Sequence, residues 1–371
     1  MDGAQQTETL IPAPGDLRSC LPEELEALLQ QWGEPRFRAG QVFAWLHKGV
    51  SDPEEMTNLP KTLREMLARV PMGTLAEEKR QISRDGTEKV LWRCADGELV
   101  ESVLMNYKYG QTVCISSQAG CRQGCAFCAS AIGGLRRDLT AGELLGQVLQ
   151  IKNARADEKK DGADGERALR VVLMGIGEPL DNFDNVMRFI ELVSHPKGLN
   201  LSRRHISLST CGLAGGIDAL ADKGYPVTLS VSLHAPDDET RNRLMPVNRT
   251  TPVETLLAAC DRFFEKTGRR VSYEYLLIDG VNDGDAQAEM LCTLLRGRAA
   301  HVNLIPMNMV RGKALRPSPP DKVKHFADAL SAGGLTATVR RKLGQDIDAA
   351  CGQLRGKNAA ERGNGELQRR L

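Results

Sequence analysis

The stretch that decides the fold of this chain is GCRQGCAFC, residues 120–128. It spaces three cysteines, Cys121, Cys125 and Cys128, as C-x3-C-x2-C. The loop follows a β-branched, strand-like run at Thr112–Ser116, and its short length keeps the three thiols close to one another. A structural zinc site would need a fourth ligand, usually from a second C-x2-C or His pair, and the sequence contains no such pair. Three cysteines without a fourth therefore need another explanation.

Three thiolates suit an iron-sulfur cluster that has one open position. A [4Fe-4S] cluster is normally held by four cysteines, so a loop with three leaves one iron for a ligand that is not protein. Phe127 completes the pattern C-x3-C-x-aromatic-C. The loop thereby resembles the radical S-adenosylmethionine (SAM) superfamily, in which the open iron binds the amino and carboxylate groups of SAM. Three buried structural cysteines or a partial zinc site are the alternatives.

The composition is that of a globular chain with reduced thiols. The 371 residues are 41% apolar and 26% charged, enough for one large core and a small one. The first residues lack the basic and apolar regions of a secretory signal, and no segment approaches the roughly 20 apolar residues of a membrane span. Ten cysteines without such a signal favour metal or redox chemistry. We predict a cytoplasmic protein that makes no membrane contact.

The N-terminal part predicts a leader followed by a small helical domain. Residues 1–18 are polar and contain proline, so we expect a disordered leader. Within residues 19–72, helical spacing of apolar residues begins at Pro22 and again near Phe37, and a third helix is expected at Lys61–Ala68. The domain carries basic residues that could contact nucleic acid phosphates or could only be solvated: Arg36, Arg38, Lys48, Lys61 and Arg64.

Residues 73–108 predict an antiparallel β-hairpin extension. Two Asp-Gly pairs, at Asp85 and Asp96, are each flanked by alternating apolar residues, which is a strong hairpin signal. We expect strands at about 77–83, 88–94 and 98–106. In the last strand Glu101 shares a face with Val103 and Met105. Its carboxylate could accept a proton among apolar neighbours, or it could be an edge residue that reaches water.

Residues 109–345 alternate strand-like runs with helical segments, which predicts an α/β fold with a parallel sheet. The strand-like runs are Thr112–Ser116, Leu169–Met174, His205–Ser209, Val227–Leu233, Val271–Leu277 and Val302–Ile305, with a last strand near Thr336–Arg340. The helical segments are Ala141–Lys152, Asp184–Ser194, Gly216–Lys223, Glu254–Thr267, Asp285–Leu295 and Lys322–Leu330. We interpret Asn153–Arg167 as a polar surface insertion.

The unusual residues of this region follow the strands. The cysteine loop follows the first run and Gly177-Glu178-Pro179 follows the second, while Ser209, Ser232, His234 and Asn308 stand at the ends of later runs. Parallel β/α barrels and open α/β sheets build their sites at the carboxyl ends of their strands. Glycine lets a backbone approach a ligand closely, and an acidic side chain can hold an ammonium group. Strand-end capping is the alternative role for the polar side chains.

Two further cysteines lie outside the loop. Cys351 precedes a glycine in residues 346–371, a predicted C-terminal loop and disordered tail, and the basic residues before it would favour its thiolate. Cys114 lies in the first strand-like run of the α/β region, on the face that it shares with Thr112. Each cysteine taken alone is more often a small buried hydrophobe than a nucleophile. From residue 311 onward 13 Lys and Arg face 6 Asp and Glu, which suits a polyanionic partner or a solvated tail.

Taken together, these segments resemble the RlmN family of radical SAM RNA methyltransferases, over about residues 21–354. The matching motifs are WGEPRFRAGQVFAWLHKGVSDPEEMTNLP, VESV, SSQ before the cysteine loop, MGIGEPL, SLSTCG, SLHAP, NLIPMN and GQDIDAACGQL. The resemblance implies a partial (β/α)6 barrel of the radical SAM type, with a small N-terminal helical domain and a short antiparallel β extension.

The resemblance also implies the roles of individual residues. Cys121, Cys125 and Cys128 would bind one [4Fe-4S] cluster. Cys351 would carry a methyl group, Cys114 would be its thiol partner, and Glu101 would accept a proton. The implied SAM contacts are Gly177, Glu178, Ser209, Ser232, Leu233, His234 and Asn308.

The implied reaction methylates carbon 2 of adenosine in 23S rRNA and in tRNA beside the anticodon. One SAM would methylate Cys351, and a second would give a radical that removes hydrogen from that methyl group. The methylene radical would add to the base, and a Cys114–Cys351 disulfide would form as the product leaves. The resemblance implies a one-electron reductant such as flavodoxin, and we expect a monomer.

One segment departs from the family pattern. After the third loop cysteine, Ala129–Leu139 reads ASAIGGLRRDL, without the Ser-Thr-Gly start and later Gly-Phe that are typical of the family. Methylation of adenine carbon 8, as in the related Cfr type, is therefore an alternative. A non-catalytic RNA-binding protein with a structural metal is a third possibility.

Overall fold

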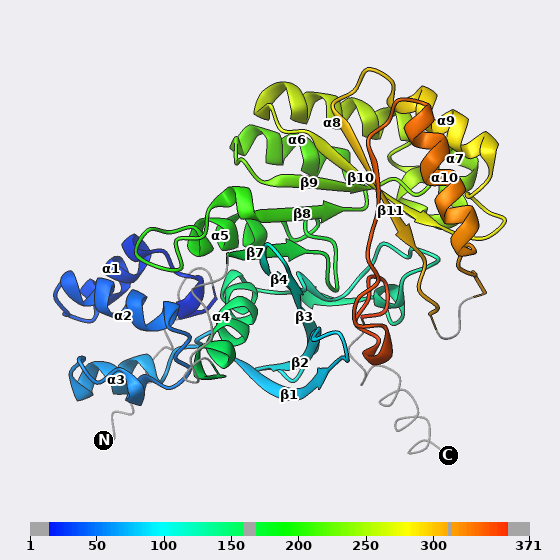
Figure 1. Ribbon diagram of the computed structural model, residues 1–371. Coiled ribbons are helices and arrows are strands. Elements are labelled where there is room, and N and C mark those ends of the chain that lie inside the picture. Colours follow the sequence, from blue (N-terminus) through cyan, green and yellow to red (C-terminus); the bar gives the residue numbers. More distant parts are fainter. Residues whose placement is uncertain (1–14, 159–167, 311–313, 355–371) are drawn as a thin grey trace, which may run out of the picture.

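The computed structural model describes residues 15–158, 168–310 and 314–354. One ten-stranded sheet runs through the molecule in the order β1-β2-β3-β4-β7-β8-β9-β10-β11-β12 (Figure 1). The strands from β4 onward are parallel to one another, whereas β1, β2 and β3 extend the sheet beyond β4 in antiparallel order. A separate two-stranded sheet, β5 and β6, carries the cysteine loop between its strands.

The strands are β1 Leu75–Ile82, β2 Glu88–Cys94, β3 Leu99–Tyr107, β4 Gly110–Cys114, β5 Gln118–Gly120, β6 Leu135–Asp138, β7 Leu169–Leu173, β8 Ile206–Thr210, β9 Thr228–Ser232, β10 Val271–Leu277, β11 Ala300–Pro306 and β12 Ala337–Val339. The helices are α1 Pro22–Gln31, α2 Phe37–His47, α3 Lys61–Leu67, α4 Ala141–Glu158, α5 Phe183–Val193, α6 Ala214–Lys223, α7 Asp238–Leu244, α8 Val253–Thr267, α9 Asp285–Leu295 and α10 Pro320–Ala332.

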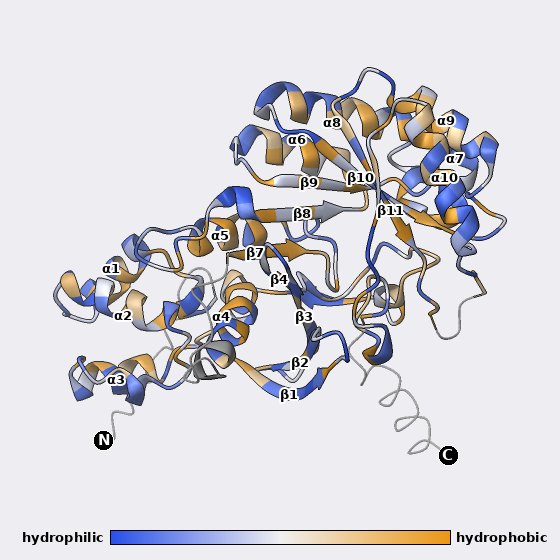
Figure 2. Cartoon of the chain, viewed as in Figure 1, coloured by the Kyte–Doolittle hydropathy of each residue, from blue (hydrophilic) through white to orange (hydrophobic). Residues whose placement is uncertain are grey.

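The predicted partial barrel is confirmed. Its strands form an open sheet rather than a closed ring, because the strand order is linear and ends at β12. Figure 2 shows hydrophobic residues along the central strands, and α6 and α8 each present a hydrophobic and a hydrophilic side. The sequence did not predict α7 or the β5–β6 hairpin, since α7 is short and polar and β6 reads Leu-Arg-Arg-Asp.

The three predicted N-terminal helices are confirmed, but the expected leader is wrong from Asp16 onward. Leu17 and Arg18 are fully buried in a 3-10 helix, Leu17–Ser19. The Arg18 guanidinium donates hydrogen bonds to the carbonyls of Gly73 and Val50, 2.8 Å each. The apolar side chains of these helices belong to the same continuous core as those of α4, α5 and the barrel strands. Residues 1–14 lie outside the described residues.

Two other predicted boundaries change. The expected surface insertion at 153–167 begins inside a helix, because α4 continues to Glu158, and residues 159–167 lie outside the described part. The C-terminal loop is described as far as Leu354, and the tail that follows, expected to be disordered, is not described. Among the described residues no helix is both long and apolar enough to cross a membrane.

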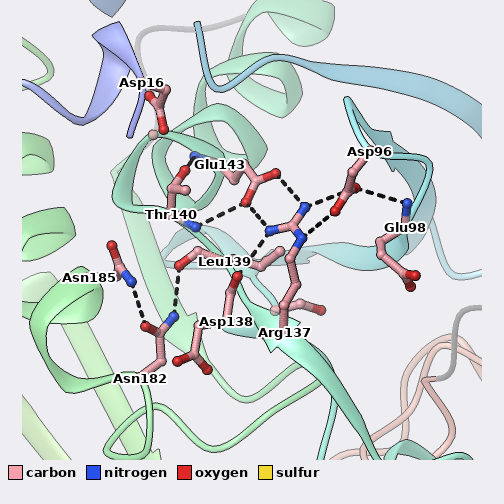
Figure 3. Close-up of polar contacts among 12 residues, drawn as sticks. Asp16, Asp96, Glu98, Arg137, Asp138, Leu139, Thr140, Glu143, Asn182 and Asn185 are labelled. Carbon is pink, nitrogen blue, oxygen red and sulfur yellow. Dashed lines mark hydrogen bonds and ion pairs between the residues drawn. The ribbon is translucent and has the colours of Figure 1, made fainter. Parts of the chain in front are cut away.

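A charged network holds the β5–β6 hairpin between the barrel and the extension (Figure 3). The Arg137 guanidinium donates to both carboxylate oxygens of Asp96, in the β2–β3 turn, and of Glu143, in the first turn of α4. Glu143 also completes a reciprocal cap with Thr140 at the start of α4. Asn182 donates to the carbonyls of Ser117 and Leu139, on either side of the hairpin. These bonds therefore fix the hairpin against the β2–β3 turn and the first turn of α4.

Removal of this guanidinium should destabilise the fold. In Arg137→Met the buried carboxylate of Glu143 loses its charged partner, so we expect the free energy of unfolding to fall by about 2 kcal/mol. Urea denaturation measures this. The matched control is Arg136→Met, since Arg136 is exposed on the same strand and should change the free energy by less than about 0.5 kcal/mol. Equal losses in the two variants would contradict the role given to Arg137.

A buried histidine should make stability depend on pH. His47, on α2, is almost fully buried, and neither ring nitrogen has a hydrogen-bond partner in the described part of the chain. Burial, reinforced by His195 and Arg18, lowers the pKa of His47 to about 4. An unfolded chain binds this proton near pH 6.5, so the free energy of unfolding is fully maintained above that pH. It should fall by about 1.4 kcal/mol per pH unit on acidification toward pH 4.

His47→Phe should remove this slope. We expect urea denaturation at several pH values between 6.5 and 4.5 to give a flatter profile for His47→Phe than for the wild type. His325→Phe is the control, because His325 is exposed and bonded to Asp285. A wild-type slope in His47→Phe would show that another group controls the acid response.

Candidate active site

The cysteine loop opens into a cavity at the carboxyl ends of the barrel strands. Cys121, Cys125 and Cys128 all line this first cavity, which has a volume of about 150 Å³. Gly120 starts the loop with φ +77°, and a Cβ there would lie 2.0 Å from the Gly134 carbonyl oxygen, so only glycine fits. The three cysteines therefore border the same space.

The donor set fits the group that the sequence predicted. All three thiols are free and half-buried. Burial raises the pKa of Cys121 to about 12 and also raises that of Cys125, and the neighbouring thiols add to both shifts. Such thiols become thiolates when a bound cation offsets their charge. Within the described residues no group of three His, Cys, Asp or Glu side chains is placed to hold a single metal ion. Three thiols around one cavity suit the separate irons of a cluster.

The loop after β7 forms the next wall of the first cavity. Gly177 has φ +109°, and a Cβ there would lie 2.7 Å from Gln118, so this position requires glycine. Glu178 is buried, and its carboxylate accepts hydrogen bonds from the backbone N–H groups of Leu180 and Cys211, 3.0 and 2.7 Å long. Burial raises the pKa of Glu178. Both residues line the first cavity.

Most of the other predicted SAM contacts meet in the same cavity. Ser209, Ser232, His234 and Asn308 line it, but Leu233 does not. The side chain of Leu233 is fully buried in the core, because this residue, directly after β9, continues the alternation of Leu229 and Val231, which face the same core. Its backbone is also bonded within the protein, since the Leu233 N–H donates to the Glu274 carbonyl, 3.0 Å, and the Leu233 carbonyl accepts from the Arg241 guanidinium, 3.0 Å.

His234 is held as a neutral hydrogen-bond donor. Its backbone has φ +58°, a conformation that residues other than glycine rarely adopt. Nδ1 accepts a hydrogen bond from the Leu276 N–H, 3.0 Å, and burial lowers the pKa of His234 to about 3. The ring is therefore neutral and its proton lies on Nε2. The Phe127 ring of the cysteine loop packs edge-on against it, with centroids 4.8 Å apart.

The C-terminal loop brings Cys351 to the cysteine loop. The Ala129 N–H donates to the Gly352 carbonyl, 2.8 Å, and the Ser130 hydroxyl donates to the Leu354 carbonyl, 2.9 Å. Gly352 turns the chain with φ +80°. Cys351 lines the first cavity together with the three loop cysteines.

A second, smaller cavity joins Cys351 to Cys114. Its volume is about 40 Å³, and both cysteines line it, together with Val103 and Met105 of β3. Cys114 and Cys351 are free thiols. Burial raises the pKa of Cys114 to about 12, and the neighbouring Cys351 adds to the shift. Cys351 thus stands at the wall between the two cavities.

Glu101 lies outside both cavities. It is buried on β3 with 3% of its surface exposed, so the alternative of an edge residue that reaches water is wrong. Its Oε1 atom lies 3.6 Å from Nζ of Lys89, and both side chains are buried. Val103 and Met105, on the same strand face, line the second cavity, whereas Glu101 lines neither.

The sequence did not single out two charged residues that build the site, Arg241 and Glu274. Arg241, on α7, is fully buried and donates to the carbonyls of Cys211, Ser232 and Leu233, which fixes the ends of β8 and β9. Glu274, in the middle of β10, is a buried carboxylate that lines the first cavity. Arg340, one of the basic residues that the sequence predicted to act on Cys351, lines both cavities together with that cysteine. Glu274 could have been noticed from the sequence, because it is a charged residue inside a largely apolar strand-like run.

Comparisons with known proteins agree with this geometry. Residues 115–291 match the family model described as the radical SAM superfamily, and residues 16–72 match the ribosomal RNA large subunit methyltransferase N-terminal domain. The chain is 51% identical to the "probable dual-specificity RNA methyltransferase RlmN" of Symbiobacterium thermophilum, over 92% of this chain and 90% of that protein. It is 48% identical to the protein of the same name from Lachnoclostridium phytofermentans, over 92% of this chain and 94% of that one.

A solved structure agrees as well. A radical SAM methyltransferase from Sphaerobacter thermophilus superimposes with a TM-score of 0.87 at 44% identity, covering 92% of this chain and 99% of that one. The fold, the cysteine loop and the C-terminal Cys351 loop are thus accompanied by close similarity over nearly the whole length. This chain belongs to the RlmN family of radical SAM methyltransferases.

Proposed function

We propose that this protein methylates carbon 2 of adenosine in RNA, through a methyl group carried on Cys351. The targets would be an adenosine of the peptidyl transferase centre in 23S rRNA and the adenosine 3′ of the anticodon in tRNA. The names of the relatives give RNA as the substrate class. The observation that carries the proposal is that Cys351 lines both the cavity of the loop cysteines and the cavity of Cys114.

Membership of the radical SAM superfamily gives the chain its cofactors, one [4Fe-4S] cluster and SAM. Cys121, Cys125 and Cys128 would hold the cluster. When bound, the cluster and SAM, used twice per turnover, supply the methyl group and a one-electron route for removing hydrogen from it. Gly177 would let the backbone approach SAM closely, and neutral His234 would donate a hydrogen bond from Nε2.

The substrate explains why a cysteine carrier is needed. Carbon 2 of adenine is electron-poor and has no acidic proton near neutral pH, so it does not displace a methyl group from SAM directly. The Cys351 thiolate is a far better nucleophile and would take the methyl group first, as a thioether. Its place at the wall of the first cavity puts it beside the loop cysteines.

Release of the product would use the second thiol. After carbon–carbon bond formation the adduct would give up one electron through the one-electron route, and a base would remove the ring proton, with Glu101 as the proposed acceptor. The Cys114 sulfur would then attack the Cys351 sulfur to form a disulfide, and the carbon would keep the electron pair of its broken bond to sulfur and take a proton, which completes the methyl group. Thiol exchange with a reductant would restore both thiols. The second cavity, which the two cysteines share, supports this pairing.

The remaining predicted partners follow from the substrate and chemistry. Arg36, Lys48 and Lys61 are exposed on the N-terminal helices and would contact RNA phosphates. A one-electron reductant such as flavodoxin would reduce the cluster. We propose that the protein acts as a monomer in the cytoplasm, where its RNA substrates occur.

Cys351→Ala should abolish RNA methylation while the cluster remains. The carrier thiol is lost, but the three loop cysteines are untouched, so the iron-sulfur absorbance of the anaerobically reconstituted protein should stay at the wild-type level. Cys292→Ala, on the distant helix α9, is the control and should retain activity. Loss of the iron absorbance in Cys351→Ala would mean that the cluster ligands are wrongly assigned.

Cys114→Ala should trap a covalent adduct between the protein and RNA. Without the second thiol the bond from the Cys351 sulfur to the base cannot be broken, so the adduct should accumulate on a denaturing gel. Mass spectrometry should place the adduct at Cys351. Unmethylated RNA without any adduct would contradict the two-thiol release.

The position of the methyl group is tested by nucleoside analysis. RNA treated with the wild-type protein is digested and its nucleosides are compared by retention with 2-methyladenosine and 8-methyladenosine. We expect 2-methyladenosine. The 8-methyl nucleoside would establish the alternative Cfr-type regiochemistry.

A further inference from the structure

A buried lysine beside the active site has no role in the reaction described above. Lys89 lies on β2, and only 3% of its surface is exposed. Its ammonium Nζ is 3.6 Å from Oε1 of Glu101, and the two side chains are 3% and 4% exposed. Burying an ammonium group costs free energy unless it is paired and hydrogen-bonded, so such a residue calls for a structural or functional reason.

The same ammonium group reaches the C-terminal loop. Nζ of Lys89 donates a hydrogen bond to the backbone carbonyl of Asp348, 3.1 Å away and 259 residues later in the chain. Asp348 adopts φ +51°, a left-handed conformation that residues other than glycine rarely adopt. Asp348 is three residues before Cys351. Lys89 therefore touches both the proposed proton acceptor and the backbone of the loop that carries the methyl group.

Neighbouring contacts fix the same loop to the antiparallel extension. The Ser83 hydroxyl and the Arg84 N–H, in the β1–β2 turn, donate to the two carboxylate oxygens of Asp346. The Gly344 N–H donates to the carboxylate of Asp85, 2.9 Å. At its other end the loop is held by Ala129 and Ser130, next to the cysteine loop. Cys351 lies between these two anchored ends.

We propose that Lys89 is a positioning residue for methyl transfer, because its ammonium group ties Glu101 to the loop that places Cys351 between the two cavities. This inference rests on the proposed function, in which Cys351 carries the methyl group and Glu101 accepts the ring proton. The inference gives the antiparallel extension a function. Strand β2 supplies the lysine that bonds to the loop carrying Cys351, and strand β3 supplies the carboxylate that the same lysine contacts.

The first test measures how freely Cys351 reacts in the absence of RNA and SAM. Reduced protein is treated with iodoacetamide, and alkylation is followed in the tryptic peptide that begins at Leu343, in which Cys351 is the one cysteine. In Lys89→Met the loop loses a charge-assisted hydrogen bond, so Cys351 should react about tenfold faster than in the wild type. Lys79→Met is the matched control, since Lys79 is exposed on the neighbouring strand, and should react at the wild-type rate.

A second variant separates positioning from charge balance. Lys89→Met leaves Glu101 buried without its ammonium partner, which could destabilise the fold. In the double variant Lys89→Met/Glu101→Met both charges of the pair are removed together. If Lys89 positions the loop, the double variant should still react about tenfold faster at Cys351. A return to the wild-type rate would overturn the proposal, because Lys89 would then serve only to balance Glu101.

A third variant tests which contact holds the loop. Glu101→Gln keeps an oxygen acceptor for Lys89 and keeps the bond from Lys89 to the Asp348 carbonyl, so Cys351 should react within about twofold of the wild-type rate. A rate as high as that of Lys89→Met would overturn the proposal. Melting temperatures of all variants are measured beside the alkylation rates, because a global loss of stability would also expose the buried Cys260.

Methylation of the carrier separates this inference from the proposed function. Mass spectrometry of the same peptide in the reconstituted protein with SAM measures the rate at which the Cys351 thioether forms. We expect Lys89→Met to form it several-fold more slowly than Lys79→Met. Unchanged alkylation and thioether rates in Lys89→Met would defeat the inference alone. The absence of any thioether in the wild type would instead defeat the proposed function.

Discussion

One contact between distant segments organises the whole site: the hydrogen bond from the Ala129 N–H to the Gly352 carbonyl. It joins the end of the cysteine loop to the C-terminal loop and sets Cys351 at the first cavity. At this point the cysteine loop ends in a single 3-10 turn, Ala129–Ala131, and the C-terminal loop has no helix or strand, so this contact helps to fix the position of both. Gly352 permits the turn with φ +80°, and the Ser130 hydroxyl adds a second bond to the same segment.

The other constraint comes from the parallel sheet. All carboxyl ends of parallel strands meet at one edge, which gathers the residues after β7, β8, β9 and β11 around the same space. This edge exposes backbone carbonyls that must be satisfied, and the buried guanidinium of Arg241 binds three of them. A single buried cation thereby stabilises the strand ends where the predicted SAM contacts Ser232 and His234 lie.

Much of this arrangement could be predicted from sequence because it follows local patterns. The β/α alternation gave the parallel sheet, the Asp-Gly pairs gave the extension, and the cysteine spacing gave the loop that lines the first cavity. The turn of Leu233 into the core was missed, since a motif match does not say which way a side chain points. The roles of Arg241 and Lys89 were also missed, because both depend on partners far away in the chain. Periodicity carries no information about such pairs.

The continuous core beneath the N-terminal helices has a consequence for how a large substrate could be read. Leu25, Phe43 and Leu63 pack in the same apolar cluster as α4 and the barrel strands, and Arg18 is bonded into the joint. One continuous core therefore joins the N-terminal helices to the barrel strands that carry the first cavity. In the proposed function, an RNA bound to these helices would therefore present its target nucleotide at a fixed distance from the bound segment, so the shape of the RNA as well as the base would decide which nucleotide reaches the first cavity.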